Sequence, residues 1–229
     1  MKALFLFTAM FLFAMVCKSE EIFFPSKEGT VLVYKTFDKK NKQTNTMKYT
    51  ITHLKTNGDN MDITYLCESM DSKDKLIFKD EITVHKIGDK LYFDMSKFIN
   101  KAAFQKDGAI PAEVEITGNN MEIPSNPSPG EALPDANVVM AMKMGIITMK
   151  MSAEVTNRKV ESIEDVTVTG GTFNCYKFTS DVSTSGFGFK MKAKSAEWYA
   201  KGIGIVKSES YDKNGNLQSR TELMEVRKS

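Results

Sequence analysis

The stretch that decides the fold is residues 194–226, KSAEWYAKGIGIVKSESYDKNGNLQSRTELMEV. Two runs rich in apolar residues, 198–206 and 217–226, flank the polar segment DKNGN at 212–216. Asn-Gly tolerates the positive φ values that a tight turn between antiparallel strands requires. The stretch therefore predicts a closing β-hairpin, and its first strand begins at the only tryptophan of the chain.

The rest of the chain is predicted to be a succession of strands joined by short turns. Runs of β-branched and aromatic residues bounded by Gly, Asn and Asp are typical of strands. Such runs occupy 30–37, 47–54, 61–67, 76–85, 137–157, 158–169, 172–179 and 187–193. The long adjacent strands beyond residue 137 favour a strongly curved antiparallel sheet or part-barrel. The predicted class is all-β with one short helix over 96–104, where Ser96 is a candidate N-cap.

Composition and charge indicate one ordinary globular domain. The 229 residues are 41% hydrophobic and 26% charged, and 31 basic against 29 acidic residues leave a net charge of +2. These charges are spread along the chain, which argues against nucleic-acid binding, because that function needs a concentrated basic patch. Four of the six prolines fall within 123–134, which is predicted to be a surface loop inside a single β-rich domain over 20–229. A linker between two domains is the alternative.

The first 19 residues have the pattern of a signal peptide. Lys2 is followed by the apolar run 3–16, which is too short for a transmembrane helix of about 20 residues. The protein is therefore predicted to be exported to the periplasm or the cell surface. The alternative is a lipoprotein anchored to the membrane through an acylated Cys17, although Val16 stands where lipoprotein peptidases prefer a small residue.

The cysteines and histidines suggest stability rather than catalysis. Cys67 and Cys175 lie in strand-like runs, and an oxidising compartment makes them a disulfide candidate. Two separately buried thiols are the alternative. Because His53 and His85 lie in no nucleophile motif and cannot alone make a closed metal site, we predict no catalytic residue, no metal and no cofactor.

Two motifs carry a family resemblance. The runs EWYAKGIGIVK at 197–207 and GTFNCYK at 171–177 resemble the TapB-like exported proteins, a group of bacterial envelope proteins found mainly in the Bacteroides group. This resemblance implies an all-β, curved-sheet domain similar to lipoprotein carriers and related lipid-handling half-barrels. It implies no catalytic residue.

Methionines alternate along 137–157, so each alternating set is expected to point to one face of its strand. Unbranched, polarizable side chains line an adaptable apolar groove well. The predicted groove residues are Met140, Met142, Met144, Met149, Met151 and Trp198. The same methionines could instead fill the core of the curved sheet.

The predicted function is a non-catalytic envelope protein that binds an apolar, lipid-like or lipopeptide ligand, or a lipoprotein, on the concave face of the sheet. A structural or interaction protein of the cell surface with a filled core is the main alternative. Thioethers also select Cu(I), which leaves a methionine-based copper protein open. A hydrolase is a further alternative, and it would need a cleft with converging polar groups.

Overall fold

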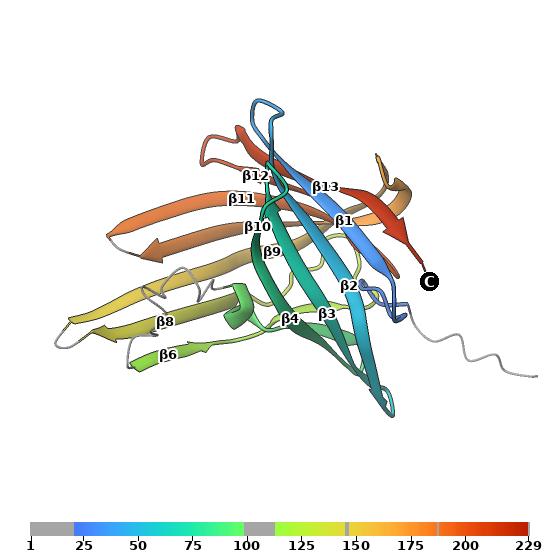
Figure 1. Ribbon diagram of the computed structural model, residues 1–229, viewed down its shortest axis with the longest axis horizontal. Coiled ribbons are helices and arrows are strands. Elements are labelled where there is room, and N and C mark those ends of the chain that lie inside the picture. The colour runs from blue at the N-terminus through green and yellow to red at the C-terminus, as the bar shows by residue number, and fades with distance from the viewer. Residues whose placement is uncertain (1–20, 99–112, 145–146, 187, 229) are drawn as a thin grey trace, which may run out of the picture.

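The computed structural model describes residues 21–98, 113–144, 147–186 and 188–228. Within these ranges the strands form one 13-stranded antiparallel sheet that is strongly curved and stays open, as the all-β prediction expected (Figure 1). The predicted signal peptide over 1–19, with Cys17, lies outside the described residues. Of the predicted helix over 96–104, only the part up to residue 98 is described, and it belongs to a short 3-10 turn, Met95–Phe98.

The sheet is mainly a meander, because most strands pair with their neighbours in sequence. Its order is β6-β8-β9-β10-β11-β12-β13-β1-β2-β3-β4-β5-β7, so β13 also pairs with β1. The strands are β1 (Val31–Asp38), β2 (Gln43–Asn57), β3 (Asn60–Asp71), β4 (Leu76–Ile87), β5 (Lys90–Phe93), β6 (Glu113–Gly118), β7 (Met121–Pro124), β8 (Ala136–Met144), β9 (Ile147–Val168), β10 (Gly171–Gly186), β11 (Phe189–Ala200), β12 (Gly204–Tyr211) and β13 (Leu217–Arg227).

The closing hairpin predicted from 194–226 is confirmed. Strands β12 and β13 pair antiparallel, and the Asp212 amide donates to the Asn216 carbonyl over 2.9 Å across the turn. Gly215 adopts a φ of 83°, in the region that glycine enters without steric cost. The Asp212 carboxylate also accepts hydrogen bonds from the amides of Asn214 and Asn216, so the turn sequence directly explains the turn geometry.

The two edges of the sheet, β6 and β7, are adjacent in the chain and separated only by residues 119–120. Asn119 holds this corner: its amide donates to the Asn137 carbonyl over 3.0 Å, and its side chain donates to the Asp135 carbonyl over 2.9 Å. The sheet therefore curls far enough to bring its two edges to one corner. The edge strands do not pair with each other, because β6 pairs with β8 and β7 pairs with β5. This curl creates the concave face on which the core is built.

The proline-rich segment 123–134, predicted to be a surface loop, is mostly exposed, but it is also fastened to β9, and we call it the proline-rich strap. The Leu133 amide donates to the Arg158 carbonyl and the Val160 amide donates to the Glu131 carbonyl, each over 2.9 Å. Ile123 and Leu133 are buried in the core. Proline has no N–H to donate, so only a few backbone groups of the segment bond to β9, while its apolar side chains at 123 and 133 are driven inward.

Arg158 fastens this proline-rich strap to β9. Its guanidinium donates to the Pro134 carbonyl over 2.6 Å and to the Glu122 carbonyl over 2.9 Å, and the side chain is buried. Glu122 belongs to β7, which pairs with β5 on its other side. One side chain thus links β9, the strap and the far edge of the sheet.

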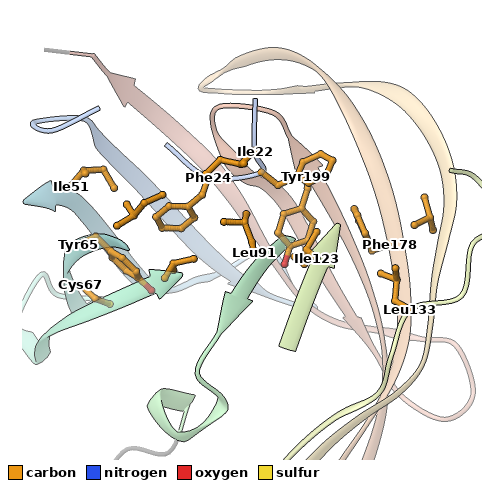
Figure 2. Packing of buried hydrophobic residues seen from close by; sticks show 14 residues of the cluster. Ile22, Phe24, Ile51, Tyr65, Cys67, Leu91, Ile123, Leu133, Phe178 and Tyr199 are labelled. Carbon is orange, nitrogen blue, oxygen red and sulfur yellow. The ribbon is translucent and has the colours of Figure 1, made fainter. Parts of the chain in front are cut away.

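The segment that precedes β1 lies inside the curve of the sheet (Figure 2). Ile22, Phe23 and Phe24 are 3%, 0% and 7% exposed and belong to the main core cluster. The Phe23 ring packs edge-on against Tyr176 and Phe178, with centroids 5.0 and 5.9 Å apart. Residues immediately after the predicted export signal therefore complete the core.

Candidate functional site

The alternating methionines meet on one face, as their spacing predicted. Met140 stands opposite Met151, and Met142 opposite Met149, across the β8–β9 pair, while Met144 ends β8 opposite Ile147. Met140 and Met142 are only 1% and 2% exposed, however, and Met149 and Met151 are half-buried. The four side chains do not line the cavities described below, so the filled-core interpretation describes this cluster better than an open groove.

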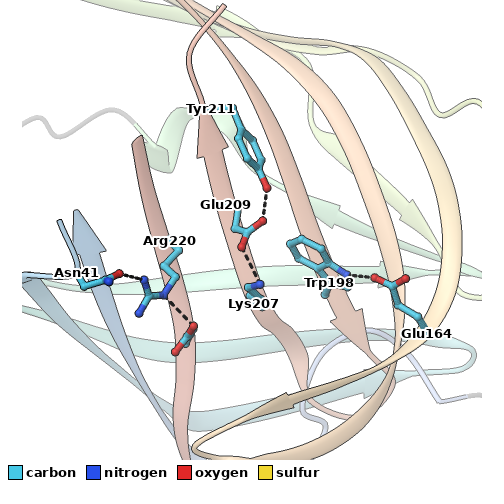
Figure 3. A network of polar contacts seen from close by, with 8 residues as sticks. Asn41, Glu164, Trp198, Lys207, Glu209, Tyr211 and Arg220 are labelled. Atoms are coloured by element: carbon cyan, nitrogen blue, oxygen red, sulfur yellow. Dashed lines mark hydrogen bonds and ion pairs between the residues drawn. The ribbon is translucent and has the colours of Figure 1, made fainter. Parts of the chain in front are cut away.

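Trp198, which was also predicted to line the groove, lines none of the three cavities described below. Its indole N–H donates to the Glu164 carboxylate over 2.6 Å (Figure 3). The ammonium groups of Lys177 and Lys207 lie 5.5 and 4.9 Å from the ring centroid. Side chains alternate along a strand, so Trp198 points to the opposite face from Tyr199. The tryptophan belongs to a second core cluster capped by charged groups.

The disulfide predicted between Cys67 and Cys175 is not formed, and both cysteines are free and buried. Five strands lie between β3, which carries Cys67, and β10, which carries Cys175. The two thiols belong to different core clusters, whereas a disulfide needs Cα atoms within about 7 Å. The alternative of two separately buried thiols therefore holds.

We expect both thiols to react slowly with alkylating reagents near neutral pH. Burial raises the pKa of Cys67 to about 11 and that of Cys175 to about 12, so the reactive thiolate is scarce. Intact mass spectrometry after iodoacetamide treatment should show labelling of a chain beginning at Glu20 only when denaturant is present. A mass that rises by two protons on reduction would contradict the free-thiol assignment.

The open part of the concave face is a groove formed by two adjoining cavities, the aromatic groove. The outer cavity, of about 390 Å³, lies over β2, β3 and β4, and the inner cavity, of about 200 Å³, reaches β11 and β12. Four residues line both cavities: Met47, Tyr49, Tyr65 and Phe93.

Contacting aromatic rings form the wall that the two cavities share. The Tyr49 ring lies 5.2 Å from that of Tyr34 and 5.1 Å from that of Tyr65, centroid to centroid. Phe24 packs against Tyr65 at 5.3 Å. Because each ring is held by the next, the wall is preorganised rather than formed on binding.

The groove opens along the first half of β4. Strand β5 pairs only with Val84–Ile87 of β4, so residues 76–83 have β3 as their only partner strand among the described residues. Ile77 lines the outer cavity and is 57% exposed, and Leu76 beside it is 50% exposed. This part of β4 is therefore an unpaired strand edge with exposed aliphatic side chains beside the outer cavity.

Each cavity of the groove has one carboxylate in its lining. Asp94 lines the outer cavity and Glu197 the inner one, and neither lining contains a lysine or an arginine from the described residues. The Tyr199 hydroxyl donates to Oε2 of Glu197 over 3.0 Å. Burial raises the pKa of the Glu197 carboxyl, against the smaller opposing effects of the Tyr199 hydrogen bond and the Arg158 charge.

Sequence reasoning missed this groove because its residues resemble ordinary core residues. The alternation of Met47, Tyr49 and Ile51 indicates a buried strand face, but not that part of the face stays uncovered. One signal was present: Glu197 interrupts the otherwise apolar run AEWYA at 196–200. A carboxyl in such a run rarely lies in a core without a specific role.

The structure also shows whether the described residues could bind a metal ion or form a membrane-spanning helix. Within 21–98, 113–144, 147–186 and 188–228, no group of three or more His, Cys, Asp or Glu side chains could hold a metal ion. His85 instead pairs with Asp62 at 2.7 Å, and His53 lies 3.4 Å from Glu28. Across the same described ranges, no helix has the length and apolar character needed to cross a membrane.

Two solved structures share this fold. A Bacteroides fragilis protein described as exported and as having a YmcC-like fold matches with a TM-score of 0.74 and 22% identity, over 91% of this chain and 100% of its own. A Parabacteroides distasonis protein described as a lipoprotein matches with a TM-score of 0.74 and 24% identity, over 90% of this chain and 99% of its own. At these identities the likeness establishes the fold alone. No curated protein matches this chain.

The family of the chain follows from a match to a family model. Both solved structures agree with the exported, Bacteroides-type, curved-sheet group that the 171–177 and 197–207 motifs suggested. The family model that matches is the DUF3108-like one, over residues 27–223, and the TapB-like grouping is not confirmed. Since this match spans most of the sequence, the chain belongs to the DUF3108-like family.

Proposed function

We propose that this protein is a non-catalytic component of the bacterial envelope that binds a lipid-like ligand in the aromatic groove. The observation that supports it is the pair of adjoining cavities, lined mainly by aromatic and aliphatic side chains and preorganised by ring contacts. Ligand sites are typically concave, apolar and largely formed before binding, at about 300–1,000 Å³. The fold shared with proteins described as exported or as a lipoprotein supports the location.

The shape of the groove suits an extended apolar chain better than a compact molecule. The outer cavity opens at β4, and the inner cavity continues past the shared wall toward Tyr199. A ligand entering beside Ile77 would cover Tyr49 and Tyr65 before it reached the inner end. Burial of an alkyl chain yields roughly 0.8 kcal/mol per methylene group, so even a short chain gains useful affinity.

The direct test is native mass spectrometry of the protein purified from the envelope of its own cells, before and after organic extraction. A removable mass in the lipid range supports the proposal. A bare chain that also fails to bind added lipids contradicts it and favours an interaction protein with a filled core. A retained copper mass would instead support the methionine-based alternative.

A groove-blocking substitution gives a second test. Ile82 is half-buried and lines the outer cavity, so we expect Ile82→Trp to reduce co-purifying lipid severalfold by filling that space. Ile163→Trp is the matched control, because Ile163 lies on β9, is 42% exposed and lines neither cavity of the groove. Equal lipid content in both variants, measured against unchanged protein by mass spectrometry, would argue against the groove as the binding site.

A further inference from the structure

The inner cavity contains polar groups that the fold does not use. Oε2 of Glu197 accepts the Tyr199 hydroxyl, but Oε1 has no hydrogen-bond partner among the described residues. The hydroxyls of Tyr34 and Tyr65 likewise have none there, although buried tyrosines usually find one. Over that part of the chain, only Ser125 Oγ is an unpaired side-chain polar atom sealed from solvent, so the three groups reach open space, and all three residues line the inner cavity.

Among the residues that the structure describes, Glu197 is the only charged one that lines the inner cavity. Opposite it on the neighbouring strands stand Phe178 of β10 and Ser208 of β12, neither of which carries charge. Arg158 of β9 is the cation that influences it, but Arg158 lines a separate side cavity of about 180 Å³, together with Lys159, and donates to two carbonyls. Glu197 also borders that side cavity and so stands between the two spaces.

The inner cavity has the chemical character of a cation site. Seven aromatic residues line it together with the one carboxyl: Phe23, Phe24, Tyr34, Tyr49, Tyr65, Phe93 and Tyr199. Aromatic faces attract ammonium groups, and quaternary ammonium ions are recognised by cages of such rings. An anionic head group would find no lysine or arginine on this lining.

Resting on the lipid-binding function proposed above, we infer that the inner cavity holds an ammonium head group paired with Glu197, while the apolar chain of the same ligand lies along the outer cavity. The ligand class is thus a cationic or zwitterionic amphiphile with an amine or quaternary ammonium end. The tyrosine hydroxyls keep their protons near neutral pH, because burial raises the pKa of Tyr34 and of Tyr65. They accept or donate hydrogen bonds at the rim of the head group.

The pairing predicts a specific pH dependence. A permanently charged ammonium binds the ionised carboxylate best, so its affinity should rise with pH through the pKa of Glu197 and then level off. Burial raises that pKa, which places the rise at higher pH than an exposed glutamate would give. The titratable neighbours Tyr199 and Tyr34 keep their protons throughout, since burial raises both of their pKa values, and Arg158 keeps its charge.

The experiment compares three probes of equal chain length by isothermal titration calorimetry, below their micelle-forming concentrations: octyltrimethylammonium, octanol and octanoate. We expect the ammonium to bind roughly 10- to 100-fold more tightly than octanol at alkaline pH. The advantage should shrink as the pH falls, while octanol binding stays constant. Tightest binding of octanoate would overturn the inference.

Glu197→Gln is the decisive variant, because glutamine keeps an acceptor for the Tyr199 hydroxyl and removes only the charge. It should abolish both the ammonium preference and its pH dependence, and leave octanol binding unchanged. Glu209→Gln is the matched control: Glu209 also accepts a hydrogen bond from the tyrosine two residues later, Tyr211, but pairs with Lys207 outside the groove (Figure 3).

The outcomes separate the two proposals. If octanol and the ammonium bind equally and independently of pH, the head-group inference fails while the apolar groove stands. If none of the three probes binds, the lipid-binding proposal itself fails. Loss of the ammonium preference in Glu209→Gln as well as in Glu197→Gln would contradict a specific role for Glu197.

Discussion

Replacing Phe23 with alanine is expected to lower the free energy of unfolding by about 3–5 kcal/mol. The Phe23 side chain is 0% exposed and packs edge-on against Tyr176, Phe178 and Tyr199. Removing the ring costs its transfer free energy and leaves a cavity that three neighbouring aromatic rings cannot collapse to fill. The effect is large although Phe23 precedes the first strand of the sheet.

Urea unfolding followed by circular dichroism measures this loss, and Phe189→Ala is the control. Phe189 is also a phenylalanine, but 78% of it is exposed at the start of β11, so its replacement should change stability by less than about 0.5 kcal/mol. Equal, small effects in both variants would show that the segment before β1 is not part of the cooperative core. Phe23 also lines the inner cavity, so Phe23→Ala should enlarge the space available to a ligand.

Replacing Arg158 with methionine is expected to lower the free energy of unfolding by about 3 kcal/mol. Methionine preserves the buried length of the side chain but loses the charge-assisted hydrogen bonds to the Pro134 and Glu122 carbonyls. Relief from burying the guanidinium offsets part of that loss. Because these bonds join β9 to β7 and to the proline-rich strap, hydrogen exchange should accelerate most in residues 121–134.

Two further arginine variants sharpen this prediction. Arg227 is 58% exposed and pairs with Glu225 on its own strand, so Arg227→Met should cost less than about 1 kcal/mol. Arg158→Lys should fall between the two, since an ammonium keeps the charge but lacks the fork that reaches both carbonyls. A stable Arg158→Met protein with unchanged exchange in the strap would refute the fastening role.

The methionine cluster on β8 and β9 shows how far side-chain positions could be predicted from the sequence. The cross-strand meeting of Met140 with Met151 was predictable in kind, because side-chain alternation has a period of two. Whether that face is covered depends on the neighbours across β8, where β6 places Ile116 opposite Met140. No local pattern in 137–157 contains this information, so the sequence could not decide whether this methionine face is open or filled.

The sequence by itself determined the all-β class, the curved antiparallel sheet and the closing hairpin at 212–216. These features depend on local physics: alternation of apolar residues, β-branched content and the φ preferences of Asn-Gly. Only the tertiary structure decided that 123–134 is fastened to β9, that Cys67 and Cys175 stay apart, and that Glu197 faces an aromatic cavity. Each of these depends on which distant strands become neighbours when the sheet curls, and that is a property of the whole chain rather than of any segment.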